Sequence, residues 1–332
     1  MDYKEIIKSI QSKKFEKIYL LHGEEPFYID LITDAILENA LLPEEKDFNQ
    51  TIVYGKDCDL LSIISDAKSY PMFSERRVVV IKEAQDFKAI DELEAYFKDP
   101  SEQTIFVINY KYKNYDSRKK AFKAASKNGL IYKSEKVKEY KLVDWISTFT
   151  KNEGYGISQK AAMLLAEFLG DDLSRIANEI EKLKLLVEKG TTINDVHIEE
   201  NIGVSKDYNI FELSNAISVR DVTKAFKIVE YFEHNPKAGP LVVVVNNLFS
   251  HFSRLMKIHF LENKSKEGIA TALKVHPFVG TQLVQSSKIY APKKIAANIA
   301  ILHEYDLKSK GYGSPAVNDS ELYKELIYKI LD

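Results

Sequence analysis

The chain has 332 residues, of which 45% are hydrophobic and 29% are charged. This composition is typical of soluble globular proteins, so it excludes a disordered chain and a fibrous repeat, and the length predicts two or three domains. The formal net charge of −2 is divided unevenly. Residues 206–332 carry 17 basic and 13 acidic side chains, whereas residues 1–136 carry 22 and 24 and residues 137–205 carry 8 and 12. The basic excess of the last third is compatible with a phosphate-facing surface.

Nothing in the sequence predicts a membrane protein or a disulfide-stabilised fold. The longest uncharged apolar run, 241–249, contains Asn246 and Asn247 and is far shorter than the about 20 residues that span a bilayer. The first residues lack the apolar segment of a signal peptide, and Cys58 is the one cysteine. We therefore expect a cytoplasmic protein.

Residues 1–136 alternate β-type runs with segments of helical periodicity. The predicted strands are 18–21, 50–54, 77–81, 103–108 and 130–132, and the predicted helices are 27–42, 60–70, 87–97 and 118–128. Strands separated by helices favour a parallel, doubly wound α/β sheet.

After residue 136 the β-type runs nearly stop. Helices over 142–153, 158–168 and 173–187 predict a small three-helix domain in residues 137–205. Residues 206–332 predict an all-helical domain, with helices over 211–218, 221–234, 240–263, 265–273, part of 276–288, 292–309 and 319–331. The run Leu241–Val245 has strand propensity, but its apolar spacing continues through Met256 with a helical period, so we predict a buried helix there.

The loop after the first strand is where an α/β fold of this kind would bind a nucleotide phosphate. Here it reads Gly23-Glu24-Glu25-Pro26, without the GxxxxGK pattern of a P-loop and with two carboxylates that repel phosphate. The acidic residue expected at the end of a buried strand to hold magnesium is also missing after 106–108, where Asn109 follows. We therefore expect a degenerate loop at Gly23, Glu24 and Glu25 that does not bind ATP.

No pattern predicts a metal site, a cofactor or a catalytic centre. The seven histidines never fall at i, i+4, and the chain contains no GxSxG. His251 and His259 lie on an apolar helical segment, where the simpler interpretation is partial burial in a core.

Two features favour a macromolecular partner. Tyr70, Met72 and Phe73 crowd onto a turn around Pro71, where they either fold back onto the core or insert into an apolar pocket of a partner. Basic residues form the second feature: a run between 111 and 127, either a solvated helix start or a phosphate contact, and a looser set with interleaved tyrosines near the C-terminus. The candidate DNA contacts in that second set are Lys288, Lys293, Lys294, Lys308, Lys310 and Tyr312.

Five segments in order resemble the delta subunit of the bacterial DNA polymerase III clamp loader. They are the opening strand and loop at 18–27, the turn and strand at 70–79, and the segments 116–120, 170–183 and 211–217. The resemblance implies an AAA+-like domain in 1–136, a three-helix lid in 137–205 and a helical collar in 206–332 that joins other loader subunits. It departs from the family pattern at Met72, where leucine or phenylalanine is more common, and in the tyrosine and lysine content of 110–123.

In this family the subunit opens the ring-shaped sliding clamp, and other subunits hydrolyse ATP. The resemblance therefore implies no catalytic site in this chain, which would be one part of a DNA polymerase holoenzyme. It also implies clamp contacts at Met72 and Phe73 with Tyr70 beside them. The implied partners are the beta sliding clamp, the gamma/tau and delta-prime subunits, and primer-template DNA. Two alternatives stay open: an active ATPase of the same superfamily, and a helical scaffold protein without clamp or DNA contact.

Overall fold

The computed structural model describes residues 2–312 and 319–332, which divide into two compact units, Met1–Val137 and Lys138–Asp332. The division into three domains, 1–136, 137–205 and 206–332, stays a prediction. None of the helices described is long and apolar enough to cross a membrane.

The first unit contains the predicted five-stranded parallel sheet. Its strands lie in the order β2-β3-β4-β1-β5, and every neighbouring pair is parallel. The strands are β1 (Ile18–Gly23), β2 (Gln50–Tyr54), β3 (Arg77–Lys82), β4 (Thr104–Lys111) and β5 (Leu130–Ser134). Strands β1, β3 and β4 are buried almost throughout, which is why they appear in the sequence as continuous apolar runs.

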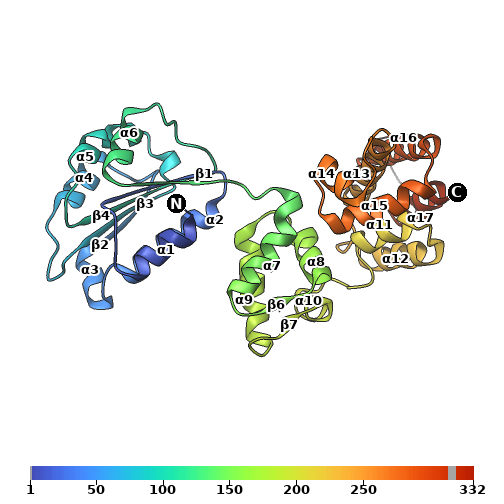
Figure 1. The fold of residues 1–332 in the computed structure, drawn as a ribbon, viewed down its shortest axis with the longest axis horizontal. Helices are drawn as coiled ribbons and strands as arrows, with labels where there is room; N and C mark the ends of the chain where they lie inside the picture. The colour runs from blue at the N-terminus through green and yellow to red at the C-terminus, as the bar shows by residue number, and fades with distance from the viewer. Residues whose placement is uncertain (1, 313–318) are drawn as a thin grey trace. The chain divides into compact units, whose positions relative to one another are not determined.

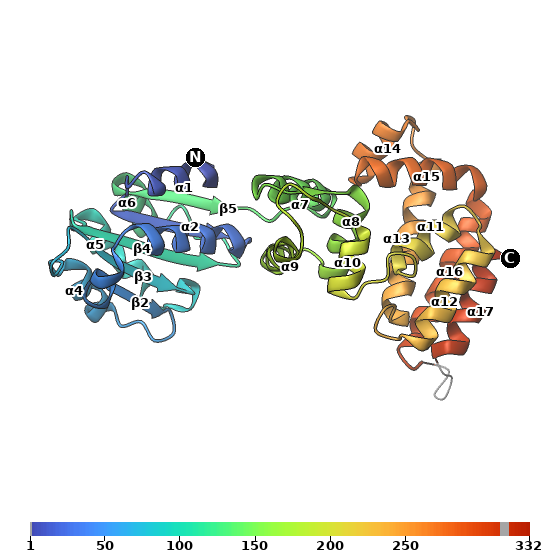
Figure 2. The ribbon, with the colours of Figure 1, turned by 90° about the horizontal axis from the view of Figure 1, so that it is seen from below.

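Helices cover both faces of this sheet (Figure 1, Figure 2). One face packs against α1 (Tyr3–Gln11) and α2 (Pro26–Asn39). The other face packs against α4 (Leu60–Lys68), α5 (Glu94–Lys98) and α6 (Lys120–Asn128). Successive strand residues point to opposite faces, so Val79 and Ile81 enter the second core while Val78 and Val80 enter the first.

Two parts of this unit differ from the prediction. The sequence interpretation missed α1, whose Ile6 and Ile10 are buried. The predicted helix over 87–97 is a 3-10 turn at Ile90–Leu93 followed by the five-residue α5. Phe87, Ile90, Leu93 and Phe97 are all buried, and they give this irregular segment the apolar spacing of a longer helix.

In the second unit, residues 138–205 contain one helix more than predicted. The helices are α7 (Leu142–Asn152), α8 (Gln159–Leu169), α9 (Leu173–Leu186) and α10 (Asp195–Ile202). A short parallel ribbon of β6 (Gly156–Ile157) and β7 (Thr192–Ile193) joins them. The three-helix prediction missed α10, which buries only Ile198, and the ribbon, which has two residues per strand.

The rest of this unit is helical, as predicted. Its helices are α11 (Ile210–Ser218), α12 (Val222–His234), α13 (Leu241–His259), α14 (Lys266–Leu273), α15 (Pro277–Ile289), α16 (Pro292–Ser309) and α17 (Asp319–Leu331). They share one hydrophobic core, to which α13 contributes Val244, Val245 and Leu248. The valine run is therefore helical despite its strand propensity, because burial of one face outweighs the propensity cost.

Candidate functional site

The turn before β3 exposes the three apolar residues that the sequence singled out. Phe73 is 95% exposed, Tyr70 is 83% exposed and Met72 is 49% exposed. Residues of this kind are normally buried, so the interpretation that they fold back onto the core is wrong. The alternative, an apolar surface available to a partner, fits their exposure.

The segments on either side of this turn are firmly anchored. At the end of α4, the carbonyl of Ala67 accepts hydrogen bonds from Thr104 Oγ1 at 2.8 Å and from Tyr96 Oη at 3.3 Å. At the start of β3, the backbone N–H of Arg77 donates to the carbonyl of Gln103 at 2.9 Å. The turn therefore projects from a rigid edge of the sheet.

Two buried polar side chains, Arg77 and Asn49, fix the backbone of the turn and of the segment beside it. The guanidinium of Arg77 is ion-paired with Asp66 and donates to the carbonyl of Phe48 at 3.1 Å. The side chain of Asn49, which is fully buried, bonds both backbone groups of Met72. Sequence reasoning missed Asn49 because it lies 23 residues before its partner and belongs to no motif.

At the opposite edge of the sheet, the loop between β1 and α2 is too short to surround a phosphate. Only Glu24 and Glu25 separate Gly23, the last residue of β1, from Pro26, the first residue of α2. Glu25 is buried, and its carboxylate accepts a hydrogen bond from the N–H of Phe27 at 3.1 Å. A protein carboxylate thus lies at the helix N-terminus, where a bound phosphate would lie.

The strand ends beside this loop do carry an acid, which corrects the expectation drawn from Asn109. Glu83 directly follows β3, and its carboxylate lies 3.0 Å from Nζ of Lys111, whose side chain is buried. The same ammonium lies 2.7 Å from Asp30 on α2. Burial alone would lower the pKa of Lys111, but its hydrogen bonds to Asp30 and Glu83 raise it, so the lysine stays charged.

This lysine already neutralises the acids that could otherwise bind a metal ion. Partial burial alone would raise the pKa of Glu83, but hydrogen bonds from Gln85 and Lys111 lower it below its ordinary value. Across the residues described, no group of three or more His, Cys, Asp and Glu side chains is arranged as a metal site.

Comparisons with known proteins agree with this geometry. One family model, described as DNA polymerase III, delta subunit, matches residues 19–135. A second, described as DNA polymerase III delta subunit, C-terminal domain, matches residues 207–326. The two ranges together take in more than two thirds of the chain. The chain belongs to the DNA polymerase III delta subunit family.

Relatives within the delta subunit family match along most of the chain. DNA polymerase III subunit delta of Bacillus subtilis (strain 168) is 26% identical over 318 residues, covering 92% of this chain and 91% of that protein. The probable DNA polymerase III subunit delta of Aquifex aeolicus (strain VF5) is 22% identical over 233 residues, covering 65% and 63%. The solved Bacillus subtilis DNA clamp loader delta protein has the same fold, with a TM-score of 0.58, 23% identity and 99% of both chains covered. The predicted fold class, an AAA+-like α/β domain followed by helical domains, is confirmed.

The lysines expected to contact DNA in this delta subunit do not form one cluster. Lys288, Lys293 and Lys294 lie around the junction of α15 and α16, whereas Lys308 and Lys310 lie at the far end of α16, whose 18 residues extend about 27 Å. Lys308 and Lys310 are ion-paired with Glu304 and Asp306 at 2.6 and 2.7 Å, and Lys294 donates to a backbone carbonyl. Lys288, Lys293 and Tyr312 are exposed. Contact with DNA stays a prediction for this set.

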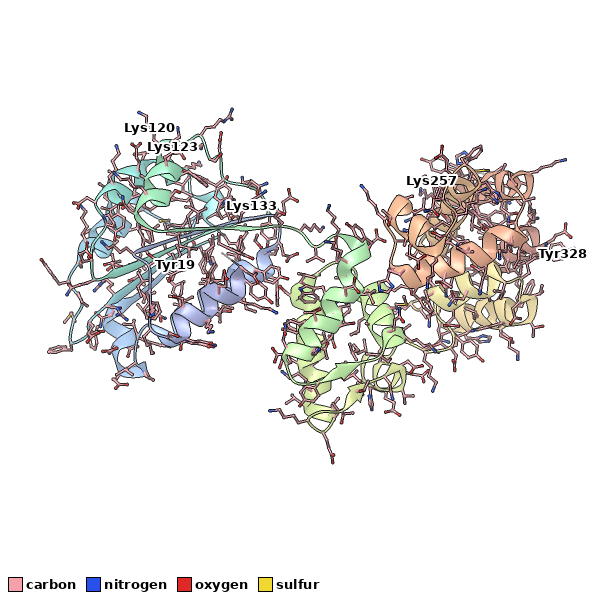
Figure 3. The ribbon with its side chains drawn as sticks, in the orientation of Figure 1. Tyr19, Lys120, Lys123, Lys133, Lys257 and Tyr328 are labelled. Carbon is pink, nitrogen blue, oxygen red and sulfur yellow. The ribbon has the colours of Figure 1, made fainter. Side chains whose placement is uncertain are left out.

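The basic run of residues 111–127 is likewise divided. Lys111 is buried, and Arg118 and Lys119 are ion-paired with Asp116 and Asp91. Lys120 and Lys123 extend outward from α6 into solvent, as Figure 3 shows. Part of this run therefore has a structural role within the domain.

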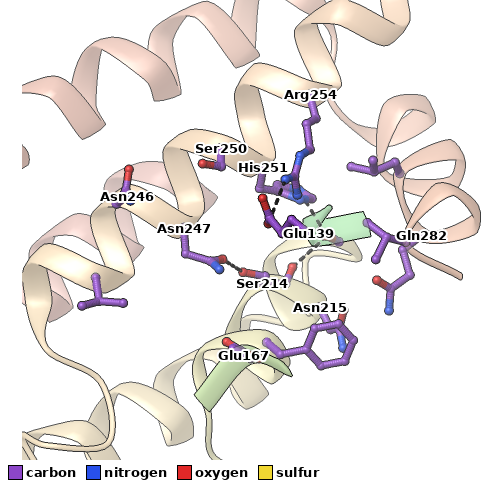
Figure 4. Close-up of a pocket in the computed structure, with 15 residues that line it drawn as sticks. Glu139, Glu167, Ser214, Asn215, Asn246, Asn247, Ser250, His251, Arg254 and Gln282 are labelled. Carbon is purple, nitrogen blue, oxygen red and sulfur yellow. Dashed lines mark hydrogen bonds and ion pairs between the residues drawn. The ribbon is translucent and has the colours of Figure 1, made fainter. Parts of the chain in front are cut away.

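A polar cavity of about 290 Å³ lies in the second unit, lined by α8, α11, α13, α15 and the segment around Glu139 (Figure 4). His251 Nε2 lies 3.2 Å from Ser218 Oγ, and burial, with a smaller effect of Arg254, lowers the pKa of His251 to about 4. The two carboxylates of the cavity are engaged elsewhere: Glu139 lies 3.8 Å from Arg254, and Glu167 accepts from the N–H of Phe211. This neutral histidine lacks the orienting carboxylate of a catalytic triad, which agrees with the predicted structural role.

Proposed function

We propose that this delta subunit binds the sliding clamp through Tyr70, Met72 and Phe73 and opens it, without hydrolysing ATP itself. The observation that carries the proposal is the nearly complete exposure of Phe73 on an anchored turn, beside Tyr70 and Met72. A large apolar side chain held in water stabilises a complex strongly when a partner buries it, because its removal from water is favourable and little side-chain entropy is lost.

Opening requires more than binding. A ligand shifts an equilibrium only by the difference between its affinities for the two states. The turn must therefore fit the open clamp better than the closed one, as it would if its pocket lay near a subunit interface of the ring and widened when that interface parted. A rigid attachment of the turn to β3 and α4 favours this mechanism, since a floppy loop would adapt to both states.

The absence of hydrolysis is supported at the other edge of the sheet. Glu25 caps α2, and Lys111 lies between Asp30 and Glu83. Placing a nucleotide phosphate here would bring it against the Glu25 carboxylate and leave magnesium to compete with a buried ammonium. ATP binding by other loader subunits would then drive the cycle.

The collar is proposed to join the other loader subunits, the gamma/tau and delta-prime chains. Its helices leave apolar side chains in solvent on α13, where Val242 is 43% exposed and Phe249 is 45% exposed. These two residues are seven apart and thus share one helix face, the arrangement expected of a helix that packs against a partner helix.

Clamp opening can be followed directly with a cognate clamp that carries a fluorescence donor and acceptor on either side of its subunit interface. Wild-type chain should lower energy transfer without nucleotide, and Phe73→Ala should remove most of this change. The control is Phe260→Ala, which truncates a 79% exposed phenylalanine of the collar and should leave the signal unchanged. Unchanged opening by Phe73→Ala would reject the turn as the opening element.

A further inference from the structure

One buried amide side chain controls the backbone of the exposed turn. Asn49, at the end of α3 (Lys46–Asn49), accepts a hydrogen bond from the N–H of Met72 at 2.7 Å. Its Nδ2 donates to the carbonyl of Met72 at 2.8 Å and to the carbonyl of Glu45 at 3.1 Å. Two hydrogen bonds to the N–H and C=O of a single residue fix both the position and the orientation of the backbone there.

The carbonyl that Asn49 holds also determines how the next residue is presented. The carbonyl of Met72 and the nitrogen of Phe73 belong to one planar peptide group, so fixing the carbonyl fixes the plane about which Phe73 turns. Phe73 has a φ of +54°, in the left-handed region that bulky residues rarely adopt. Since its side chain is 95% exposed, packing of that side chain does not hold this conformation, and the neighbouring backbone must.

Asn49 is itself held in place. The carbonyl of Phe48, the residue before it, accepts a hydrogen bond from Arg77, whose guanidinium is also ion-paired with Asp66 on α4. The end of α3, the end of α4 and the start of β3 are thus joined by partly buried polar contacts. Because the turn lies between α4 and β3, these contacts hold both of its ends.

We propose that Asn49 is a positioning residue that holds Met72 and Phe73 in their clamp-binding conformation before the clamp arrives; this inference rests on the proposed function of the turn. A loop that is already ordered loses less conformational entropy on binding than a loop that must be ordered by its partner. Asn49 lies beneath the turn without being exposed itself, so it contributes through the turn and not through contact with the clamp.

The test is a double-mutant cycle on clamp affinity. Asn49→Ala should weaken equilibrium binding of the clamp by about tenfold in the wild-type chain. In a chain that carries both Met72→Ala and Phe73→Ala, the same change should weaken binding by under about twofold, because the two side chains being positioned are gone. The matched control is Asn109→Ala, which removes another fully buried asparagine of the first unit, one on β4 that accepts from Thr33 Oγ1 at 3.0 Å, and should leave clamp affinity unchanged.

The cycle separates the two claims. If the double change Met72→Ala with Phe73→Ala leaves affinity unchanged, the proposed function of the turn fails. If the double change weakens binding but Asn49→Ala does not, or if Asn49→Ala weakens binding equally in both backgrounds, only the positioning role of Asn49 fails.

A measurement on the unmodified chain applies even where Asn49→Ala does not fold. The amide hydrogen of Met72 should exchange slowly with solvent, although the residue lies on an exposed turn, because a buried oxygen accepts it. Exchange of that amide at the rate of an unstructured peptide would overturn the proposal.

Discussion

Gly23 shows how a single residue sets the geometry at the end of β1. Its φ is +140°, and a Cβ built there would lie 2.0 Å from the carbonyl oxygen of Ser134, a backbone atom of β5. Neither the conformation nor the space admits a side chain. The glycine that resembles the first residue of a phosphate loop is therefore required by the packing of β1 against β5, independently of any nucleotide.

Gly23→Ala should consequently destabilise the first unit by on the order of 3 kcal/mol, from backbone strain and displacement of β5. Gly170→Ala is the matched control, because Gly170 also has a positive φ, +70°, but a Cβ added there would have nothing within 4 Å of it. That change should cost only about 1 kcal/mol. Urea unfolding of both variants checks the difference, and equal losses would contradict the steric account.

The elements show which parts of the fold could be predicted from sequence. The buried strands and the collar helices were predicted closely, because β-branched runs and long helical periodicities directly reflect burial. Short elements were not: α10 buries one residue, and the β6–β7 ribbon is held by tertiary pairing that no local pattern records. Met72 and Phe73 were identified by composition and resemblance, but Asn49 depends on a contact between distant segments. The sequence analysis sought an acid only after 106–108, where Asn109 follows, and so did not identify Glu83, which follows β3.

Helix α8 gives a pH-dependent prediction through Glu167. Glu167 is exposed as a residue, but the protein around its carboxylate partly removes that group from water. This desolvation, and to a lesser degree the charge of Glu212, raises the pKa of Glu167 to about 7, above its ordinary value of 4.5. The folded state therefore binds this proton more tightly than the unfolded state, and the resulting stability is present below about pH 4.5 and is lost as the pH rises through about 7.

Glu167→Gln removes this titration. Because Glu167 is an exposed residue, solvent weakens this effect, and the variant should gain on the order of 1 kcal/mol of unfolding free energy relative to wild type between pH 5 and pH 8. Chemical denaturation at the two pH values measures the gain. A difference that does not change with pH would show that Glu167 is ionised in the folded protein. His251, whose pKa is lowered to about 4 in the folded protein, is present in both chains, so its own titration cancels when the variant is compared with wild type at each pH.

At the scale of the whole molecule, the two edges of the sheet carry different features. One edge carries the exposed turn, and the other has the phosphate position filled by Glu25 and the ammonium of Lys111 between two acids. An AAA+-like sheet thus keeps its shape with the Glu25 carboxylate at the N-terminus of α2, while the apolar turn at its other edge is exposed.

This arrangement predicts that the isolated chain does not bind magnesium-ATP. Titration calorimetry at millimolar nucleotide should give no saturable heat, because the internal carboxylate already occupies the helix N-terminus. Saturable binding in the micromolar range would instead favour the alternative of an active ATPase.

The central claim is tested most directly by equilibrium binding of the isolated chain to the cognate sliding clamp without nucleotide. Wild type should bind tightly, and the double variant Met72→Ala with Phe73→Ala should lose at least about 2 kcal/mol of binding free energy while its circular dichroism spectrum stays unchanged. Failure of the wild-type chain to bind the clamp at micromolar concentration and low salt would contradict the account and favour the helical scaffold.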